Sequence, residues 1–367
     1  MTAYQLTLKT LSPLHIGDGD ELKQDFDFVA RSGRTYRINE DALLMAKEES
    51  VRPDRGGRYP NPGELIRDDD LDNGALFRYS LKGVPRSAKP DARVKSFIKD
   101  IHDRPYIPGS SLKGALRTAL AWNGWKESNV SVNDITGRSR AWVGQSLERK
   151  MFGANPNMDI MRALHVSDLV GPQSAGGKLM LVNAQVLTKK SSGSPIELEA
   201  VAGDVTFTGT ISVDDALFSP MAEPILHFSN RKRWLDELVQ RTQAHSAARI
   251  KELAHWFESA SENYSSVARF YRQLDQAGIA ENQALAQIGW GAGWDGKTFG
   301  SHLKRDALRF EQIVSDFRLH KASKDSPPRK AGDDFPRSKR AAMVLKDRVA
   351  SAVAPFGWVL LELVPKG

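Results

Sequence analysis

The sequence predicts an α+β fold, arranged as two split β-α-β units of the ferredoxin-like type with helical insertions. Two observations favour this class. Segments with the two-residue period of strands alternate with segments of helical period in both halves of the chain. The strict strand–helix–strand rhythm of a parallel sheet and the short repeats of a solenoid are both missing. A length of 367 residues favours two domains, which we place at 1–200 and 201–367.

The first half opens with a strand over residues 1–9, because polar and apolar side chains alternate there and place Leu6 and Leu8 on one face. Gly17 and Gly19 then predict a turn. Residues 52–73 are poor in apolar side chains and rich in Arg, Asp, Pro and Gly, which predicts an exposed insertion. The other expected elements are a strand over 35–38, a helix capped by Asn39 or Asp41 that ends at Ala46, a helix that starts at Ser110 or Ser111, and a helix over 143–152.

After the helix over 143–152, the chain is expected to continue with strands and then with helices. Leu235, Val239, Ile250 and Leu253 follow one side of a long amphipathic helix over 232–259. A shorter helix over 266–276 completes a helical insertion of about 232–276. The expected strands, in chain order, cover 163–168, 178–188, 196–202, 205–213 and, as a buried closing strand, 357–364.

Composition limits the possible chemistry. The chain has no cysteine, which excludes disulfides, thiolate zinc sites and a thiol nucleophile and fits a cytoplasmic location. No apolar run is long enough to span a membrane, so we expect no membrane partner. Lys and Arg number 52 against 45 Asp and Glu, a net charge of +7 that suits a polyanionic partner. Residues 318–348 hold ten Lys/Arg against four Asp, and we expect a basic loop there that leads into a short helix from Ala341.

The segment PGSSLKGALR predicts a helix whose first turn offers free backbone N–H groups to an anion. Ser110 and Ser111 are the candidate caps. Lys113 and Arg117 are four residues apart and therefore share a face, where they could hold one or two RNA phosphates. The alternative is a well-capped surface helix with solvated charges, and spacing alone favours that alternative.

A glycine-rich loop over 288–300 is the second candidate site, with glycines at positions 289, 291, 293, 296 and 300. We expect Gly289, Gly291, Gly293 and Lys297 to lie against an RNA backbone, with tryptophans available to stack or pack. A structural loop packed into the core is an equal alternative. The loop also matches the dinucleotide and the Walker phosphate-binding patterns, the latter through Lys297 and Thr298, but no apolar strand is expected before it. We therefore expect no nucleotide cofactor.

His15, in LSPLHIG, is the one candidate for a general base of RNA cleavage. A structural or RNA-contacting role is the stronger interpretation, because spacing defines no set of lysine, histidine and tyrosine around it. Asp18, Asp20 and Glu21 could bind a metal ion, but a solvated acidic turn is the stronger interpretation, and we predict no metal site and no catalytic residue in this chain.

Four segments in a fixed order give the sequence a resemblance to a known family: LSPLHIG (11–17), YIPGSSLKGALR (106–117), IGWGAGWDGKT (288–298) and PFGWVLLEL (355–363). The sequence resembles RAMP-superfamily proteins of type III-A CRISPR effector (Csm) complexes, in particular the subunit at the 3′ end of the guide RNA. The insertion at 52–73 lies outside this resemblance.

The resemblance implies two RAMP domains of the RNA-recognition type that bind a CRISPR RNA and cap its 3′ end. It implies contacts with the backbone RAMP subunit and the small helical subunit of the Csm complex. It also implies a role in guide maturation and antiviral defence that depends on recruited cellular ribonucleases rather than on an active site in this chain. A guide-processing endoribonuclease that uses His15 as its base is the alternative within the same superfamily.

Overall fold

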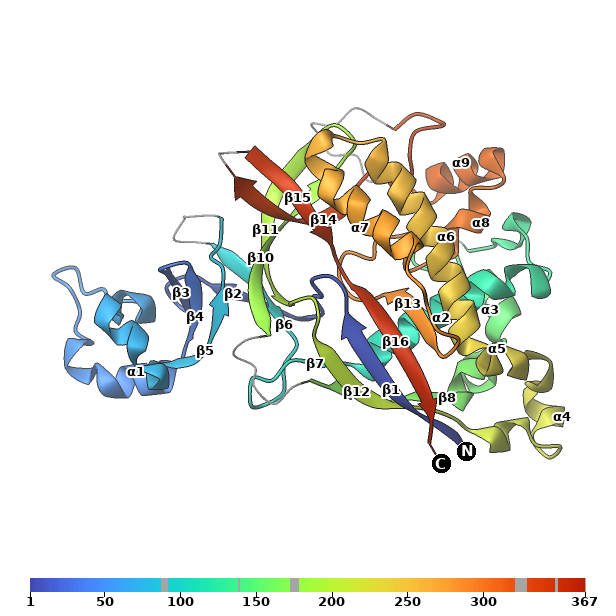
Figure 1. Ribbon diagram of the computed structural model, residues 1–367, viewed down its shortest axis with the longest axis horizontal. Helices are drawn as coiled ribbons and strands as arrows, with labels where there is room; N and C mark the ends of the chain where they lie inside the picture. Colours follow the sequence, from blue (N-terminus) through green and yellow to red (C-terminus); the bar gives the residue numbers. More distant parts are fainter. Residues whose placement is uncertain (87–91, 138, 172–177, 321–328, 347–348, 367) are drawn as a thin grey trace.

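The opening strand, β1 (Thr2–Thr10), lies inside the first of two sheets and pairs antiparallel on both sides. Leu6 and Leu8 are fully buried, which confirms the predicted alternation. One neighbour is β12 (Thr206–Val213), and the other is β16 (Trp358–Pro365), close to the other end of the chain. The two termini therefore lie side by side (Figure 1).

The structure is a computed structural model that describes residues 1–86, 92–137, 139–171, 178–320, 329–346 and 349–366. The first sheet runs in the order β13-β16-β1-β12-β9-β7, and β8 pairs with β12. Its other strands are β7 (Tyr106–Ile107), β8 (Leu164–Val166), β9 (Leu169–Val170) and β13 (Gln283–Gln287).

The second sheet runs in the order β2-β6-β11-β10-β5-β4-β3, with the hairpin of β14 and β15 attached to β10. Long antiparallel pairing of β10 with β11 forms its spine. The strands are β2 (Gly17–Lys23), β3 (Phe28–Arg31), β4 (Arg34–Ile38), β5 (Phe77–Lys82), β6 (Arg93–Phe97), β10 (Leu179–Leu187), β11 (Ser192–Val201), β14 (Lys339–Lys346) and β15 (Val349–Pro355).

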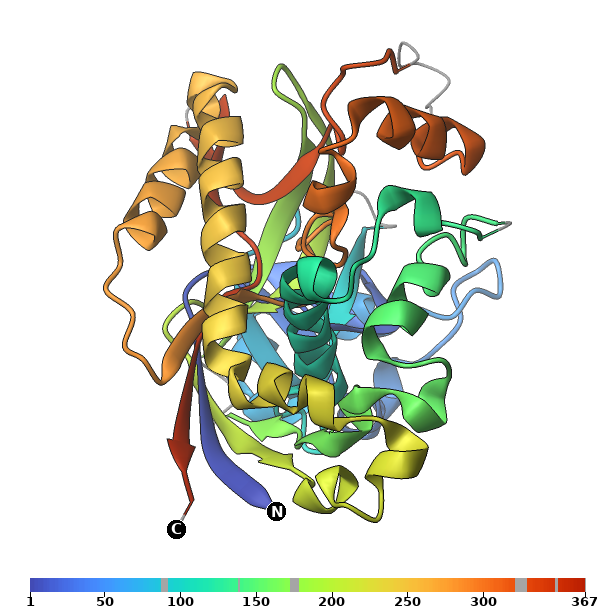
Figure 2. The ribbon, with the colours of Figure 1, turned by 90° about the vertical axis from the view of Figure 1, so that its right-hand side faces the viewer.

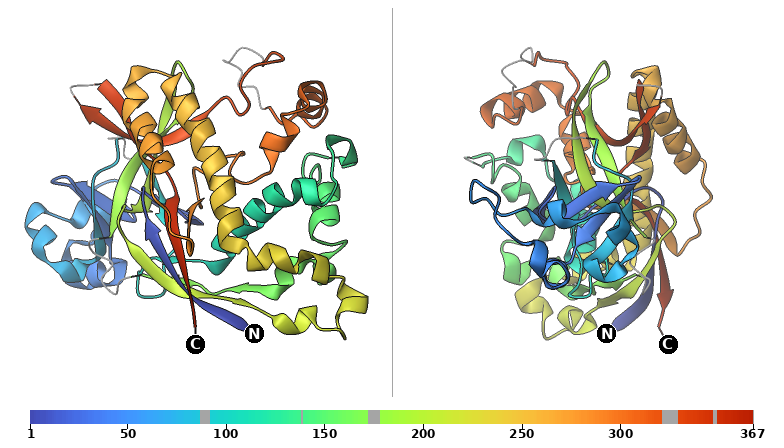
Figure 3. Two further views of the ribbon diagram at one scale, coloured as in Figure 1. Left: turned by 45° about the vertical axis from the view of Figure 1, so that its right-hand side comes forward. Right: turned by 90° about the vertical axis from the view of Figure 1, so that its left-hand side faces the viewer.

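Helices cover the first sheet, and two long ones pack on each other there (Figures 2 and 3). In the first of these, α2 (Gly109–Glu127), Leu112, Leu116 and Leu120 are buried in the same core as β1, as their spacing predicts. The other helices are α1 (Glu40–Ala46), α3 (Gln145–Phe152), α4 (Glu223–Leu226), α5 (Lys232–Asp236), α6 (Leu238–Glu258), α7 (Ser265–Asp275), α8 (Gly300–Leu303) and α9 (Ala307–Asp316).

The insertion is exposed over most of its residues, as predicted, but it belongs to a packed lobe formed by β3, β4, β5, α1 and short 3₁₀ turns, which projects from the body (Figure 1, blue). Leu65 and Ile66 of the insertion are 9% and 6% exposed and join a small separate core with Val29 and Leu43. Asn39 caps α1, since its side chain accepts from the backbone N–H of Ala42. The polar stretch is thus anchored by Leu65 and Ile66, with the partly buried Leu71 packed against the same core.

Three predicted elements were wrong. The turn at Gly17 and Gly19 is instead an irregular edge strand, β2, whose pairing with β6 shifts register. The helix expected from Ala341 is β14, because pairing with β10 and β15 buries the alanines in a sheet. The long helix breaks at Glu237 into α5 and α6, and the break lets Trp234 pack into the main core.

Strands from both halves of the chain enter each sheet. The expected domain boundary at 200/201 falls between the last two residues of β11, and the next strand, β12, belongs to the other sheet. Yet β1 pairs in the first sheet with β16, and β14 pairs in the second sheet with β10. The fold is therefore α+β with interleaved halves, and its division into two ferredoxin-like domains stays a prediction.

Candidate nucleic-acid interface

The two sequence motifs of the candidate site meet in space. A hollow of about 320 Å³ lies between the first turns of α2 and the glycine-rich loop. Ser110 and Ser111 line it from α2, and Gly289 and Lys297 line it from the loop. Four of the nine predicted RNA-binding residues are thus brought together, although about 180 residues separate the two motifs.

The start of α2 is set by its first glycine rather than by a serine cap. Gly109 packs so closely that an added Cβ would lie 2.3 Å from the carbonyl oxygen of Val166, and its N–H donates to Asp168 Oδ1 at 2.8 Å. The helix begins there, so the expected capping by Ser110 or Ser111 is wrong. Both serines lie in the first turn, where they border the hollow.

The glycine-rich loop follows a strand, β13, which the sequence did not predict. Gly289, Gly291 and Gly293 all have positive φ angles, of 71°, 98° and 67°. A Cβ at Gly289 would lie 2.5 Å from the carbonyl oxygen of His15, and the N–H of Trp290 donates to that same oxygen at 2.8 Å. Glycine therefore allows the loop to lie directly against the LSPLHIG segment.

The Walker alternative lacks the geometry of a phosphate loop. The Thr298 hydroxyl donates to the carbonyl of Trp294 at 2.9 Å. The helix that follows, α8, starts only at Gly300 and has four residues, so no long helix directs its N-terminus at a phosphate here. The strand before the loop pairs antiparallel with β16, unlike the parallel strand of a nucleotide fold.

The tryptophans of the loop pack inside the protein. Trp290 meets Phe356 edge-on, with ring centroids 5.2 Å apart, and Trp294 meets Phe335 in the same way at 4.9 Å. Their rings are partly buried in these contacts. Of the two interpretations of these side chains, packing describes the observed geometry, and they anchor the loop that borders the hollow.

Lys113 and Arg117 do share a face of α2, but they border a second hollow, of about 410 Å³, together with Arg149 and Arg162. Arg117 is held by Asp159 at 2.7 Å and Glu148 at 3.2 Å, and its guanidinium lies 3.9 Å from the ring centroid of Phe152. Lys113 has no ion pair among the described residues, and its partial burial lowers its pKa. Only Lys113 of this pair is thus available to a phosphate.

Of the two alanine variants of this pair, only Lys113→Ala should therefore change the salt dependence of RNA binding. One phosphate contact fewer should flatten the slope of log affinity against log salt by roughly 0.7. Arg117→Ala should leave that slope unchanged and instead lower the free energy of unfolding by about 1.5–3 kcal/mol, since its charged hydrogen bonds are internal. Titrations of single-stranded RNA between low and physiological salt, beside denaturant curves, measure both. A slope that flattens only in Arg117→Ala would reverse the assignment.

His15 is enclosed. Its side chain is 2% exposed, its Nδ1 lies 2.6 Å from the carbonyl oxygen of Glu199, and its ring meets Phe97 and Trp290 edge-on. Burial lowers its pKa and so favours the neutral ring. The candidate base and RNA contact of the sequence analysis thus has no solvent-facing surface for a substrate, and its observed contacts are structural.

A buried charge network next to His15 was missed by sequence reasoning. The Glu199 carboxylate is fully buried and accepts from Lys99 Nζ, from the Tyr79 hydroxyl at 2.7 Å and from the N–H of Phe97 at 2.8 Å. Burial and this carboxylate raise the pKa of Tyr79 far above its usual range. The four residues join β5, β6 and β11.

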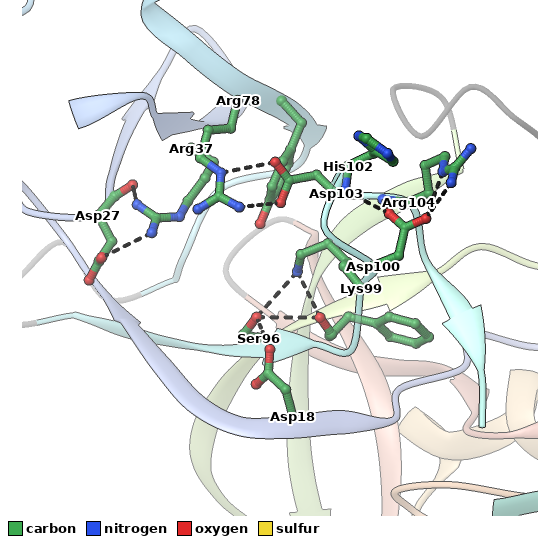
Figure 4. Close-up of polar contacts among 12 residues, drawn as sticks. Asp18, Asp27, Arg37, Arg78, Ser96, Lys99, Asp100, His102, Asp103 and Arg104 are labelled. Atoms are coloured by element: carbon green, nitrogen blue, oxygen red, sulfur yellow. Dashed lines mark hydrogen bonds and ion pairs between the residues drawn. The ribbon is translucent and has the colours of Figure 1, made fainter. Parts of the chain in front are cut away.

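The network continues to the surface through Ser96. Lys99 Nζ donates to Ser96 Oγ at 3.2 Å, and Ser96 Oγ donates to Asp18 at 2.7 Å (Figure 4). Nearby, Arg78 forms a two-pronged contact with Asp103 (Figure 4). Lysine, histidine and tyrosine therefore do gather here, but around a shared glutamate inside the protein.

The basic stretch over 318–348 is partly neutralised by internal contacts. Lys339 pairs with Asp295 at 2.8 Å, and Arg329 pairs with Glu311. Residues 321–328 and 347–348 of the stretch lie outside the described residues. Elsewhere in the described ranges, no group of three His, Cys, Asp or Glu side chains is placed to hold a metal ion, and no helix has the length and apolarity needed to cross a membrane.

Known proteins resemble this chain over almost its whole length. A protein of Methanocaldococcus jannaschii named "CRISPR system Cms protein Csm5" is 25% identical over 98% of this chain and 89% of its own. The protein of that name from Streptococcus thermophilus is 30% identical over 36% of this chain and 42% of its own.

Solved structures show the same fold. A chain in a cryo-electron microscopy structure of a ternary complex of Csm, crRNA and target RNA from a type III-A CRISPR-Cas system matches with a TM-score of 0.69 and 24% identity, over 99% of this chain and all of that one. The crystal structure of T. onnurineus Csm5 matches with a TM-score of 0.64 and 22% identity, over 96% and 99%. Since the model of the RAMP superfamily also matches residues 7–245, well over half of the sequence, this chain belongs to the RAMP superfamily and is a Csm5-like member of it.

Proposed function

We propose that this chain is an RNA-binding subunit of a type III-A Csm complex, and that it holds the 3′ end of the guide RNA in the hollow between α2 and the glycine-rich loop. One observation carries the proposal: the hollow joins Ser110, Ser111 and Lys297 from two distant motifs at one surface. The names of the relatives, and the presence of a chain of the same fold in a complex of Csm and crRNA, support it.

The chemistry of the hollow suits a nucleic-acid backbone. Lys297 is exposed and has no carboxylate partner within the described part of the chain. Serine hydroxyls can donate to phosphate oxygens, and Gly114 and Ala115 are small enough for a strand to lie close to the helix. Such contacts hold phosphates without selecting a base sequence, which is what a subunit that serves many guides requires.

In this proposal the chain binds the guide without cleaving it. His15 supports this, because a general base must come within hydrogen-bond reach of the reacting hydroxyl and this ring is enclosed. Trimming of the guide then belongs to recruited cytoplasmic ribonucleases, and the backbone and small subunits of the complex are the protein partners. Cleavage of repeat RNA by the purified chain, lost in His15→Ala, would contradict this part of the proposal.

Gly114→Glu is the variant that tests the hollow. A Cβ at Gly114 meets no atom within 4 Å, so the substitution fits the helix and places a negative charge at the hollow. Stability should be unchanged or slightly higher, because glutamate favours a helix more than glycine does. Affinity for single-stranded RNA, measured by fluorescence anisotropy on the full chain, should fall by about tenfold or more.

Two matched variants control for charge and for the backbone. Gly278→Glu adds the same charge at an exposed glycine whose Cβ also meets nothing within 4 Å, outside the hollow, and should keep wild-type affinity. Gly114→Ala changes the helix without adding charge or bulk, and should bind RNA nearly as well as the wild type. Equal RNA affinity in Gly114→Glu and Gly278→Glu would exclude this hollow as the RNA site.

A further inference from the structure

A cavity of about 170 Å³ lies on the other side of the glycine-rich loop from the hollow. Arg249 of α6 and Arg340 of β14 border it, together with residues 291–295 of the loop. Gln287 and Ala292 line both the cavity and the hollow, so the two spaces are separated only by the loop and the end of β13.

Arg249 brings a buried positive charge without an ion pair to this cavity, whose lining also contains the carboxylate of Asp295. Its side chain is 5% exposed. Nη2 donates to Gln287 Oε1 at 2.7 Å and to the carbonyl of Ala292 at 3.3 Å, whereas the buried Nε has no acceptor. No carboxylate lies within 4 Å of the guanidinium among the described residues. Burial is the main cause that lowers its pKa, and the nearby charges of Asp295 and Glu252 offset that effect only in part.

Arg340 is a second arginine that lines this cavity without an ion pair among the described residues. Its guanidinium lies 4.8 Å from the ring centroid of Trp290, its buried Nε has no acceptor, and burial lowers its pKa. No ion pair of Arg340 exists in the part of the chain that the structure describes. Its neighbour Lys339, by contrast, is paired with Asp295, which also pairs with Lys304 at 2.8 Å. The local acid is thus already shared by two lysines, and both arginines remain unpaired.

The loop adds hydrogen-bond donors to the same wall. None of the backbone N–H groups of residues 291–295 finds an acceptor within the described residues. Gly291 and Gly293 have positive φ angles, and alternation of such residues with ordinary ones can turn successive N–H groups toward one point. A buried charge without a counter-ion costs free energy, and an anion bound beside it would remove part of that cost.

We propose that this cavity binds a phosphate group of the guide RNA, held by Arg249 and Arg340 and by the amides of the glycine-rich loop. The assignment of this phosphate to the guide RNA rests on the proposed function. Guanidinium groups bind phosphate oxygens in pairs of parallel hydrogen bonds, which a chloride ion cannot accept. The volume suits a single phosphate group rather than a whole nucleotide.

The test uses the full purified chain and two probes, inorganic phosphate and a short single-stranded RNA. Phosphate at constant ionic strength should raise the melting temperature of the wild type, and chloride should not. Arg340→Gln and Arg249→Gln should each weaken phosphate binding by at least about tenfold. Because the side chain of Arg340 is only partly buried, Arg340→Gln can test the proposal even if Arg249→Gln fails to fold. Arg269→Gln removes the same charge from an exposed position of α7 and should bind phosphate as the wild type does.

The RNA arm distinguishes the source of the phosphate. Saturating RNA should abolish the phosphate response, and Arg340→Gln should flatten the salt slope of RNA binding by roughly 0.7. A phosphate response equal in wild type and Arg340→Gln would overturn the cavity as the site. A response that persists unchanged with RNA bound would overturn the RNA source and leave a free anion. Phosphate binding at the cavity in a chain with no RNA affinity would refute the proposed function alone.

Discussion

Lys99→Met should lower the free energy of unfolding by about 3–5 kcal/mol, because it leaves the carboxylate of Glu199 buried without a cation. The Lys99 side chain is 9% exposed and that of Glu199 is 0% exposed, so water cannot take over the lost contact. Lys99 also donates to the carbonyl of Phe97 at 2.7 Å and to Ser96, and the variant loses both bonds. Chemical denaturation of the purified chain measures the change.

Two further variants separate this effect from the general cost of removing a lysine. Lys232→Met breaks a surface pair with Asp236, whose side chains are 41% and 53% exposed, and should cost no more than about 0.5 kcal/mol. Adding Glu199→Gln to Lys99→Met should recover part of the loss, since the uncompensated charge is then gone. A loss below about 1 kcal/mol in Lys99→Met would mean that Glu199 is solvated or protonated in solution.

Gly289→Ala should also cost stability, by about 2–5 kcal/mol in total. A non-glycine residue at a φ of 71° costs roughly 1–2 kcal/mol, and displacing the His15 carbonyl, 2.5 Å from the new Cβ, adds about 1–3 kcal/mol. The loop should move away from the LSPLHIG segment, so RNA affinity should fall as well. Denaturant curves and RNA titrations on the same preparation measure the two effects.

Gly293→Ala is the matched control. Its φ of 67° is nearly the same, but the Cβ would find its nearest atom only at 3.9 Å. It should cost only the backbone strain of roughly 1–2 kcal/mol. Equal losses in the two variants would show that the contact between Gly289 and His15 is not what fixes the loop.

Segments with clear periodicity could be predicted from the sequence, and segments whose structure depends on distant partners could not. The alternation of β1 and the leucine stripe of α2 are local signals, and both are confirmed. In β13, Ala284 and Ala286 lie in a strand that pairs with β16 and contacts α6. Alanine has a low propensity for strands, so the sequence gives no local signal for this element. In β14, pairing with β10 overrode the helical preference of alanine.

The candidate site was predicted as two separate motifs, and only the fold shows that they share a hollow. Ser110 and Lys297 carry no local signal of each other. Lys113 and Arg117 have the same spacing signal, yet Asp159 and Glu148, distant in sequence, form ion pairs with the guanidinium of Arg117. Glu199 is an acidic residue next to apolar residues of β11, and this pattern could have predicted that it has a buried cationic partner. Nothing local in the sequence identifies Lys99, 100 positions away, as that partner.

The pairing of β1 with β16 has a consequence for how the chain acquires its structure. Leu6 lies opposite Leu363, 357 positions later, so the ribosome must make nearly everything in between before this edge of β1 can be covered. At typical rates of synthesis that interval is roughly 20–70 s, during which a hydrophobic strand with free N–H and C=O groups waits without its second neighbour. Closure of the first sheet is therefore a late event, and the edge of β1 that later pairs with β16 stays open until then, because β12 pairs with the opposite edge.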